Sequence, residues 1–263
     1  MIKSISEKLE VLFVNRKNAY AKAFLRPDGK KMGYATEEGL IESNLIQEHI
    51  NGNITMGCYQ LDGTKLKWGC LDFDLDTKED FDNAKKVYKF ALLDGYHPLA
   101  ELSGGGEFKV HIWFFAKGEA KDMQIFLKDL CDRIGIKPHE IFPKQEDARD
   151  GFGNLVKLPL AYHLVTKKKS VLLDDDFKPL TLEQTNEKLA FHIANPDKLP
   201  KIIIKEAPIQ VPFKLGSVNP TEFDGFFNFV LENELPAGPT AKNKASDKIV
   251  GVNDNILKNQ AIW

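Results

Sequence analysis

Residues 68–75, WGCLDFDL, show the clearest alternation of hydrophobic and polar positions in the chain. Leu71 and Phe73 alternate with Asp72 and Asp74, and this period of two predicts a half-buried strand. Residues two apart in a strand point to the same side, so one face is apolar and the other presents two carboxylates. The alternation therefore predicts a pair of acidic side chains held close together on a sheet.

Hydrophobic spacing elsewhere predicts a mixture of helices and strands. Helices are predicted over residues 4–14, 36–50, 76–95 and 119–134, and strands over residues 16–25, 54–59, 99–102, 108–115 and 153–160. Asp62-Gly63 is typical of a hairpin turn, so we expect the acidic pair on the second arm of a hairpin. Asp76 and Glu79 have the spacing of a capping box. This order of elements favours an α+β fold, with helices on one face of the sheet and polar residues on the open face.

The character of the sequence changes after about residue 195, where prolines occur at positions 196, 200, 208, 212 and 220. We therefore expect a core over residues 1–195 and a Pro-rich arm or linker over residues 196–263, with a partly helical C-terminal extension. Residues 223–231 have helical spacing, whereas residues 237–246 are typical of a flexible segment.

Composition narrows the class of protein. Lys and Arg number 36 against 38 Asp and Glu, so the overall charge gives no indication of nucleic-acid binding. A local basic groove could still bind nucleic acid. The three cysteines are far apart and form no Cys-x-x-Cys pair, so we expect neither a zinc site nor a disulfide framework. The first residues lack the apolar stretch of a signal peptide, and no segment has the length of a membrane span. We expect a soluble, cytoplasmic protein with no membrane partner.

The acidic pair suggests a metal site. Two carboxylates held close together repel each other unless something positive lies between them. Mg²⁺ or Mn²⁺ would fill that role, because these hard cations prefer oxygen ligands. The alternative is that Asp72 and Asp74 simply face water at the end of a strand.

Glu140 is a candidate for a third metal-binding carboxylate. It lies in a short extended segment, residues 138–145, that is apolar and bounded by prolines, where an acid is costly to bury unless it is paired or bound to a metal. Glu146, Asp147 and Asp150 are rivals, but they belong to a polar loop in which acids are solvated without a special role.

Two further segments carry residues suited to binding phosphate. Ser103 begins a glycine-rich loop whose backbone N–H groups can approach a phosphate closely, and His111 on the following strand could hold a phosphate oxygen. Asn154 and Lys157 are polar residues in a segment that otherwise resembles core. Lys157 would either neutralise a triphosphate or extend from a buried strand towards water.

The order of these segments resembles the three motifs of the archaeo-eukaryotic primase superfamily. They are DFD at 72–74, SGG followed by HIW within 103–113, and the phrases EIFPKQ at 140–145 and GFGNLVKLPL at 151–160. The last two phrases are most similar to CRISPR-associated primase-polymerases and related conflict-system primases. The resemblance covers about residues 10–165. It implies an archaeo-eukaryotic primase-type catalytic core with an RRM-like sheet covered by helices.

The resemblance also implies roles for individual residues. Metal ligands with a catalytic role would be Asp72, Asp74 and Glu140, and nucleotide-binding residues would be Ser103, His111, Asn154 and Lys157. Residues 107–109 lengthen the loop between Ser103 and His111 relative to the family pattern, which makes Lys109 an additional candidate for phosphate contact.

The implied activity is template-directed nucleotidyl transfer by a DNA-directed primase-polymerase, with NTPs or dNTPs as substrates and two Mg²⁺ or Mn²⁺ ions. Implied partners are a single-stranded DNA template, a primer, and CRISPR or other defence or replication proteins. A metal-dependent nuclease is one alternative, because carboxylates on a strand also serve hydrolysis. A non-enzymatic RRM-like single-strand binder is the other, and it requires exposed aromatic residues, for which Trp113 is the one candidate on the face of His111.

Overall fold

The computed structural model describes residues 3–200 of the 263-residue chain. The helices are α1 (Ile5–Phe13), α2 (Ser43–Asn51), α3 (Lys78–Leu93), α4 (Ala120–Asp132) and α5 (Leu182–Ala194). The strands are β1 (Ala19–Leu25), β2 (Met32–Glu38), β3 (Met56–Tyr59), β4 (Lys65–Phe73), β5 (Leu99–Leu102), β6 (Val110–Glu119), β7 (Glu140–Phe142), β8 (Leu155–Lys157) and β9 (Val171–Leu173). The segments predicted at 223–231 and 237–246 lie outside the described residues, and the domain boundary near residue 195 stays a prediction.

The larger sheet contains five antiparallel strands in the order β7-β4-β6-β5-β9. Four of them follow the chain order β4-α3-β5-β6-α4-β7, the βαββαβ arrangement of ferredoxin-like and RRM-like folds. β4 lies between β7 and β6, so the strand that carries Asp72 has a hydrogen-bonded neighbour on each side. The α+β class and the RRM-like sheet predicted from the sequence are confirmed.

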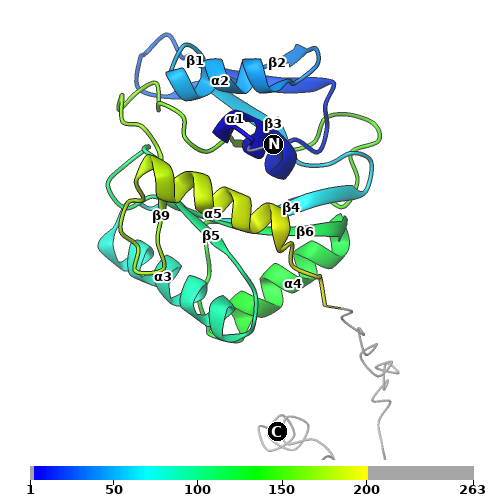
Figure 1. Ribbon diagram of the computed structural model, residues 1–263, viewed down its shortest axis with the longest axis vertical. Coiled ribbons are helices and arrows are strands. Elements are labelled where there is room, and N and C mark those ends of the chain that lie inside the picture. Colours follow the sequence, from blue (N-terminus) through cyan, green and yellow to red (C-terminus); the bar gives the residue numbers. More distant parts are fainter. Residues whose placement is uncertain (1–2, 201–263) are drawn as a thin grey trace, which may run out of the picture. The chain divides into compact units, whose positions relative to one another are not determined.

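One face of this sheet forms a hydrophobic core with α3 and α4. Leu71 and Phe73 of β4 and Ile112 and Phe114 of β6 are all fully buried in it. The apolar faces of α3 and α4 cover these residues, and Figure 1 shows the two helices next to each other along one side of the strands. The period-two alternation of β4 therefore fixes which face of the sheet is left for Asp72.

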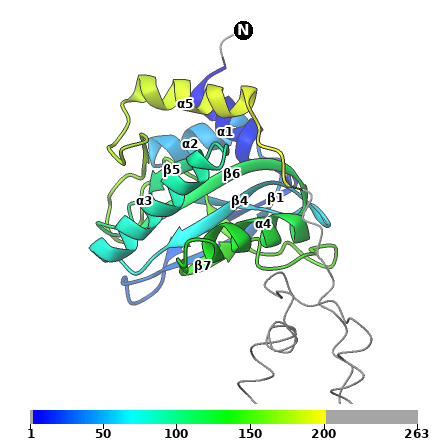
Figure 2. The same ribbon diagram turned by 90° about the horizontal axis from the view of Figure 1, so that it is seen from below.

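The opposite face is apolar along most of its length and polar at one end. Trp68 and Trp113 lie on this face, are each 1% exposed, and contact each other edge to face. Phe13 of α1 packs on Trp113 at 4.9 Å between ring centroids, and α1 lies beside α5 in Figure 2. The expectation of an open polar face was therefore too broad. Only the end that carries Asp72 and His111 is polar, because the indole rings farther along require an apolar cover.

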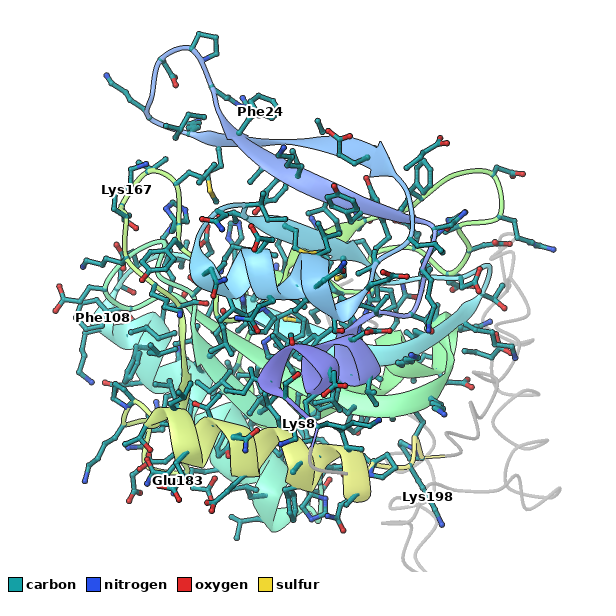
Figure 3. All side chains as sticks on the ribbon, turned by 45° about the horizontal axis from the view of Figure 1, so that its top comes forward. Lys8, Phe24, Phe108, Lys167, Glu183 and Lys198 are labelled. Carbon is teal, nitrogen blue, oxygen red and sulfur yellow. The ribbon has the colours of Figure 1, made fainter. Side chains whose placement is uncertain are left out.

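A smaller antiparallel sheet has the strand order β2-β1-β3-β8. Lys157 of β8 pairs with Gly57 of β3, which brings this lysine into the smaller sheet. β3 and β4 belong to different sheets, so Asp62-Gly63 joins two sheets, and the prediction that the acidic pair lies on a hairpin arm was wrong. The long hairpin is instead β1–β2, which projects in Figure 3 with Phe24 labelled on it.

Two further local predictions were wrong. Residues 36–38 belong to β2, where backbone pairing with β1 outweighs their helical spacing, and α2 begins only at Ser43. Thr77 rather than Asp76 caps α3, because its hydroxyl accepts a hydrogen bond from the backbone N–H of Asp80 at 3.1 Å. Asp76 has φ of 58° and a different partner, described below.

One helix, α5, was not predicted from the sequence. Thr181 and Gln184 form a reciprocal capping box at its start, and Leu189 is fully buried against α1. The Thr-x-x-Gln pattern ahead of an apolar spacing was the signal that could have identified it. α5 matters for the site indirectly, because it helps to cover the apolar part of the sheet face.

Candidate active site

Four polar residues form a single row across the larger sheet. Asp72 of β4 lies directly opposite Glu140 of β7 on one side and His111 of β6 on the other. His111 in turn lies opposite Glu101 of β5. Directly opposed residues of antiparallel strands project from the same face, so these four side chains emerge together. We call Glu140, Asp72, His111 and Glu101 the polar row.

His111 bridges two acids within the row. Its Nδ1 lies 2.9 Å from Oε2 of Glu101, and its Nε2 lies 3.5 Å from Oδ1 of Asp72. Burial lowers the pKa of His111, but Asp72 and then Glu101 outweigh burial, so that its pKa is raised above the ordinary value. The imidazole is therefore fixed between two carboxylates and favours its cationic form, which can donate to an anion.

Asp72 is the least satisfied member of the row. Burial raises its pKa; His111 opposes this effect, while Asp74 and Glu140 add to it. Within the described residues its Oδ1 is buried without a hydrogen-bond partner, since His111 is too distant for a strong bond. An unpartnered buried acceptor costs about 1–3 kcal/mol. The position therefore suits a cation or a donor brought by a ligand.

Glu101 is the site residue that the sequence analysis missed. Its side chain is fully buried, and its Oε2 also accepts from Nε1 of Trp113 at 3.3 Å. Burial raises the pKa of Glu101, but Lys157, followed by His111, outweighs burial and holds the pKa at about 2. The available signal was an acid in the apolar strand 99–102, two positions before Ser103 and hence on the same face.

A second set of candidate residues lies two positions along the chain from members of the polar row. Nζ of Lys109 is 3.0 Å from Oδ1 of Asp74, just beyond the end of β4. The backbone N–H of Ser103 donates to the carbonyl of Lys109 at 2.9 Å, so Ser103 and Lys109 close the loop between β5 and β6. The Ser103 hydroxyl accepts from Gly105 N–H at 3.4 Å, within its own loop. The structure thus brings Asp74, Lys109 and Ser103 together beside the polar row.

Asp76 fixes the shape of the lengthened glycine loop. Its Oδ1 accepts hydrogen bonds from the backbone N–H groups of Glu107 at 2.7 Å and Phe108 at 2.8 Å. Gly106 packs so closely on this carboxylate that a Cβ at that position would lie 2.3 Å from Asp76 Oδ1. The extra residues 107–109 are therefore held against the end of β4, which places Lys109 near Asp74.

Lys157 reaches the polar row from the smaller sheet. Its Nζ lies 3.5 Å from Oε1 of Glu101, and the residue is only 7% exposed. His49 of α2 fixes the neighbouring backbone, since its Nε2 contacts the carbonyl of Pro159 at 3.0 Å. Asn154 lies before β8, and its side chain makes no hydrogen bond or ion pair with the row among the contacts of residues 3–200. Its nucleotide-binding role stays a prediction.

The three predicted metal ligands are close in the fold but each has a basic neighbour. Glu140 pairs with Lys144, Asp74 with Lys109, and Asp72 faces His111. In the part of the chain that the structure describes, no three His, Cys, Asp or Glu side chains gather in a metal-binding arrangement. The donor set nevertheless fits a hard divalent cation, because it consists of carboxylate oxygens around the unpartnered Oδ1 of Asp72.

Comparison with known proteins identifies the family. A family model described as "TOTE conflict system, Archaeo-Eukaryotic Primase domain" matches residues 7–190, which is more than half of the chain. The chain belongs to this family. The predicted membership of the archaeo-eukaryotic primase superfamily is therefore confirmed. The matching family is one of conflict-system primases.

Two other comparisons add little to this assignment. The AEP domain of the primase-polymerase (PrimPol) of cyanophage S-2L matches with 10% sequence identity and a TM-score of 0.39, over 69% of this chain and 94% of that one. No curated protein matches. No helix within residues 3–200 of the primase domain is long and apolar enough to cross a membrane.

Proposed function

We propose that this primase domain is a template-directed nucleotidyltransferase, a primase-polymerase that makes and extends primers on single-stranded DNA from NTPs or dNTPs. Family membership supports a nucleotidyltransferase-type activity in general. The observation that carries the finer proposal is the polar row, in which Asp72 lies directly between Glu140 and His111. Acids beside a cationic imidazole suit the two needs of this reaction, a metal site and a phosphate site.

Asp72, Asp74 and Glu140 are the proposed ligands of Mg²⁺ or Mn²⁺. When bound, the ions supply activation of a primer 3′-hydroxyl and neutralise charge on the leaving pyrophosphate. Asp72 is suited to a central position, since its Oδ1 has no partner within the described residues. Asp74 would exchange its ion pair with Lys109 for the metal, and the freed ammonium group would then be available to a phosphate.

The basic residues around the row are proposed to hold the triphosphate. His111 and Lys157 are buried basic residues next to Asp72 and Glu101. Lys109 lies at the end of the glycine loop that starts at Ser103. Positive groups that are already in place cost little reorganisation when charge develops in the transition state. Asn154 is assigned to the same site because the phrase GFGNLVKLPL, which contains it, resembles the family motif.

The two alternatives receive less support. A nuclease would use the carboxylates but has no need of a set of cations arranged for a triphosphate. A non-enzymatic single-strand binder would need aromatic rings exposed on the sheet for base stacking. Trp113, the one candidate for that role, is buried with its indole N–H bonded to Glu101.

A single incubation separates these functions. The protein is mixed with an unprimed single-stranded DNA template, labelled NTPs or dNTPs, and Mn²⁺ or Mg²⁺, and the products are resolved by length. Without a primer we expect labelled chains no longer than the template. With an annealed primer we expect the primer itself to be extended. Shortening of the template without incorporation would favour a nuclease, and binding without any product would favour the single-strand binder.

A further inference from the structure

Glu101 lies where the larger and smaller sheets meet, in contact with His111 and Lys157 of the candidate phosphate site. It is a fully buried carboxylate on β5, and the two cations it faces come from different sheets. His111 belongs to β6 of the larger sheet, and Lys157 belongs to β8 of the smaller one. Among the described contacts, Glu101 is the side chain that touches both cations.

We propose that Glu101 is a positioning residue that holds His111 and Lys157 together as one anion-binding unit for the phosphates of the incoming nucleotide. The inference rests on the proposed function and deepens it. Glu101 itself would not touch the nucleotide. It would act through the two side chains that do.

The contacts of the carboxylate divide between its two oxygens. Oε2 accepts from Nδ1 of His111 at 2.9 Å and from Nε1 of Trp113 at 3.3 Å. Oε1 lies 3.5 Å from Nζ of Lys157, which is an ion pair without hydrogen-bond geometry. Because Nδ1 of His111 is occupied, the free Nε2 edge of the ring is turned towards Asp72. Glu101 thus contacts both cations, while Nζ of Lys157 and Nε2 of His111 make no hydrogen bond among the described residues.

The buried charges also explain why a carboxylate is required at this position. Lys157 is 7% exposed and its Nζ has no hydrogen-bond partner among the described residues. Burying an ammonium group without a counter-charge is costly, and Glu101 is the acid within ion-pair distance of Nζ. Glu101 supplies this counter-charge before any nucleotide arrives. Its low pKa, which Lys157 and His111 maintain against the opposing effect of burial, is consistent with a permanent negative charge.

A purely structural role would have different consequences. If Glu101 served only to join the sheets, its replacement would weaken folding and reduce all activities of the domain in parallel. If it positions His111 and Lys157, its replacement would act on nucleotide binding far more than on template binding. The two roles can be separated by measuring the affinities individually.

The test compares Glu101→Gln with the wild-type protein. Affinities are measured by calorimetry for ATP and dATP with Mg²⁺, and by fluorescence anisotropy for a labelled oligothymidylate. We expect nucleotide affinity to fall about tenfold or more, as for the loss of hydrogen bonds to charged groups, with template affinity changed less than about twofold. In primer extension, KM for nucleotide should rise more than kcat falls. Trp113→Phe is the matched control: it removes the other donor to the same oxygen, and should leave nucleotide affinity unchanged.

Further variants keep the inference testable if Glu101→Gln does not fold. Lys157→Met and the double variant Glu101→Gln/Lys157→Met remove one charge and both charges of the pair. Because Glu101 also holds His111, we expect the double variant to bind nucleotide at least about threefold more weakly than Lys157→Met. Equal affinities, or unchanged nucleotide affinity in folded Glu101→Gln, would overturn the positioning role alone. A wild-type protein that binds no nucleotide would overturn the proposed function, and this inference with it.

Discussion

Asp72 of β4 and Glu140 of β7 occupy directly opposed positions on neighbouring antiparallel strands. This register places their carboxylates on the same face, and Glu140 is one of the charges that raise the pKa of Asp72, after burial and Asp74. Asp147, a sequence rival of Glu140, is instead bonded to Arg149 within its own loop. The register therefore supports Glu140 as the third carboxylate of the site.

Replacing Glu140 by Gln should impair catalysis nearly as much as replacing Asp72, because an amide is a much weaker ligand for a divalent cation. Nucleotide incorporation on a primed template, measured over a range of Mn²⁺ concentrations, tests this. The matched change is Asp147→Asn, which alters an acid held in the nearby loop and should leave incorporation close to wild type. A silent Glu140→Gln together with an inactive Asp147→Asn would show that the third ligand has been assigned wrongly.

His111→Ala should weaken the use of nucleotide much more than the binding of template. The imidazole lies between Asp72 and Glu101, where a cation can meet a phosphate. The expected effect is a rise in KM for nucleotide of about tenfold or more, the cost of a charge-assisted hydrogen bond. Steady-state kinetics and template titrations on the same preparation provide the two numbers. If only template affinity changes, His111 belongs to the nucleic-acid path instead.

Asp76→Ala should loosen the glycine loop. The substitution removes the acceptor for the N–H groups of Glu107 and Phe108 and places alanine at φ of 58°. We expect a loss of about 1–3 kcal/mol in the free energy of unfolding, measured by urea denaturation. Asp76→Asn keeps an acceptor oxygen and a residue that tolerates this conformation, so it should be nearly silent. Equal losses for both variants would show that the carboxylate charge matters rather than the loop geometry.

Acid should destabilise the domain through His49. This residue is fully buried, accepts from the N–H of Met56 at 3.0 Å, and has a pKa lowered to about 4 by burial. In the unfolded chain its pKa is about 6.5, so between these values the unfolded state binds more protons. The stabilisation is complete above pH 6.5 and is lost as the pH falls towards 4, with a contribution of about 2 kcal/mol between pH 7 and pH 5.

Urea denaturation at pH 7 and pH 5 checks this prediction. The loss of stability between the two pH values should be smaller in His49→Gln than in the wild type. His139→Gln changes an exposed histidine and should keep the wild-type difference. Equal losses of free energy on acidification in the variant and the wild type would show that His49 is not the source of this pH dependence.

Much of the fold and of the candidate site could be predicted because it depends on local periodicity. The alternation around Asp72 defines a strand with one apolar face, and a similar alternation over residues 108–115 puts His111 on the polar face of β6. The carboxylate and phosphate candidates were then assigned because their order along the chain resembles the primase motifs. These features do not require knowledge of which strands are neighbours.

Features that depend on long-range pairing could not be predicted in this way. The turn at Asp62-Gly63 has the same residues whether it joins two arms of a hairpin or two sheets. Glu101 gains its role only because β5 pairs with β6 and because β8 of the other sheet brings Lys157 to it. Trp113 has the sequence position of an exposed platform residue but is covered by Phe13 of α1, a contact that no pattern in either segment reveals.

The most direct test of the account is primer synthesis by Asp72→Asn/Asp74→Asn. Asn is nearly isosteric with Asp but lacks the charge that holds a divalent cation, so the double variant should fold with a wild-type circular dichroism spectrum. On an unprimed single-stranded template with labelled nucleotides and Mn²⁺, we expect both initiation and extension to fall below about a thousandth of the wild-type rate. Retained extension by the folded double variant would contradict the assignment of this carboxylate pair as the catalytic centre.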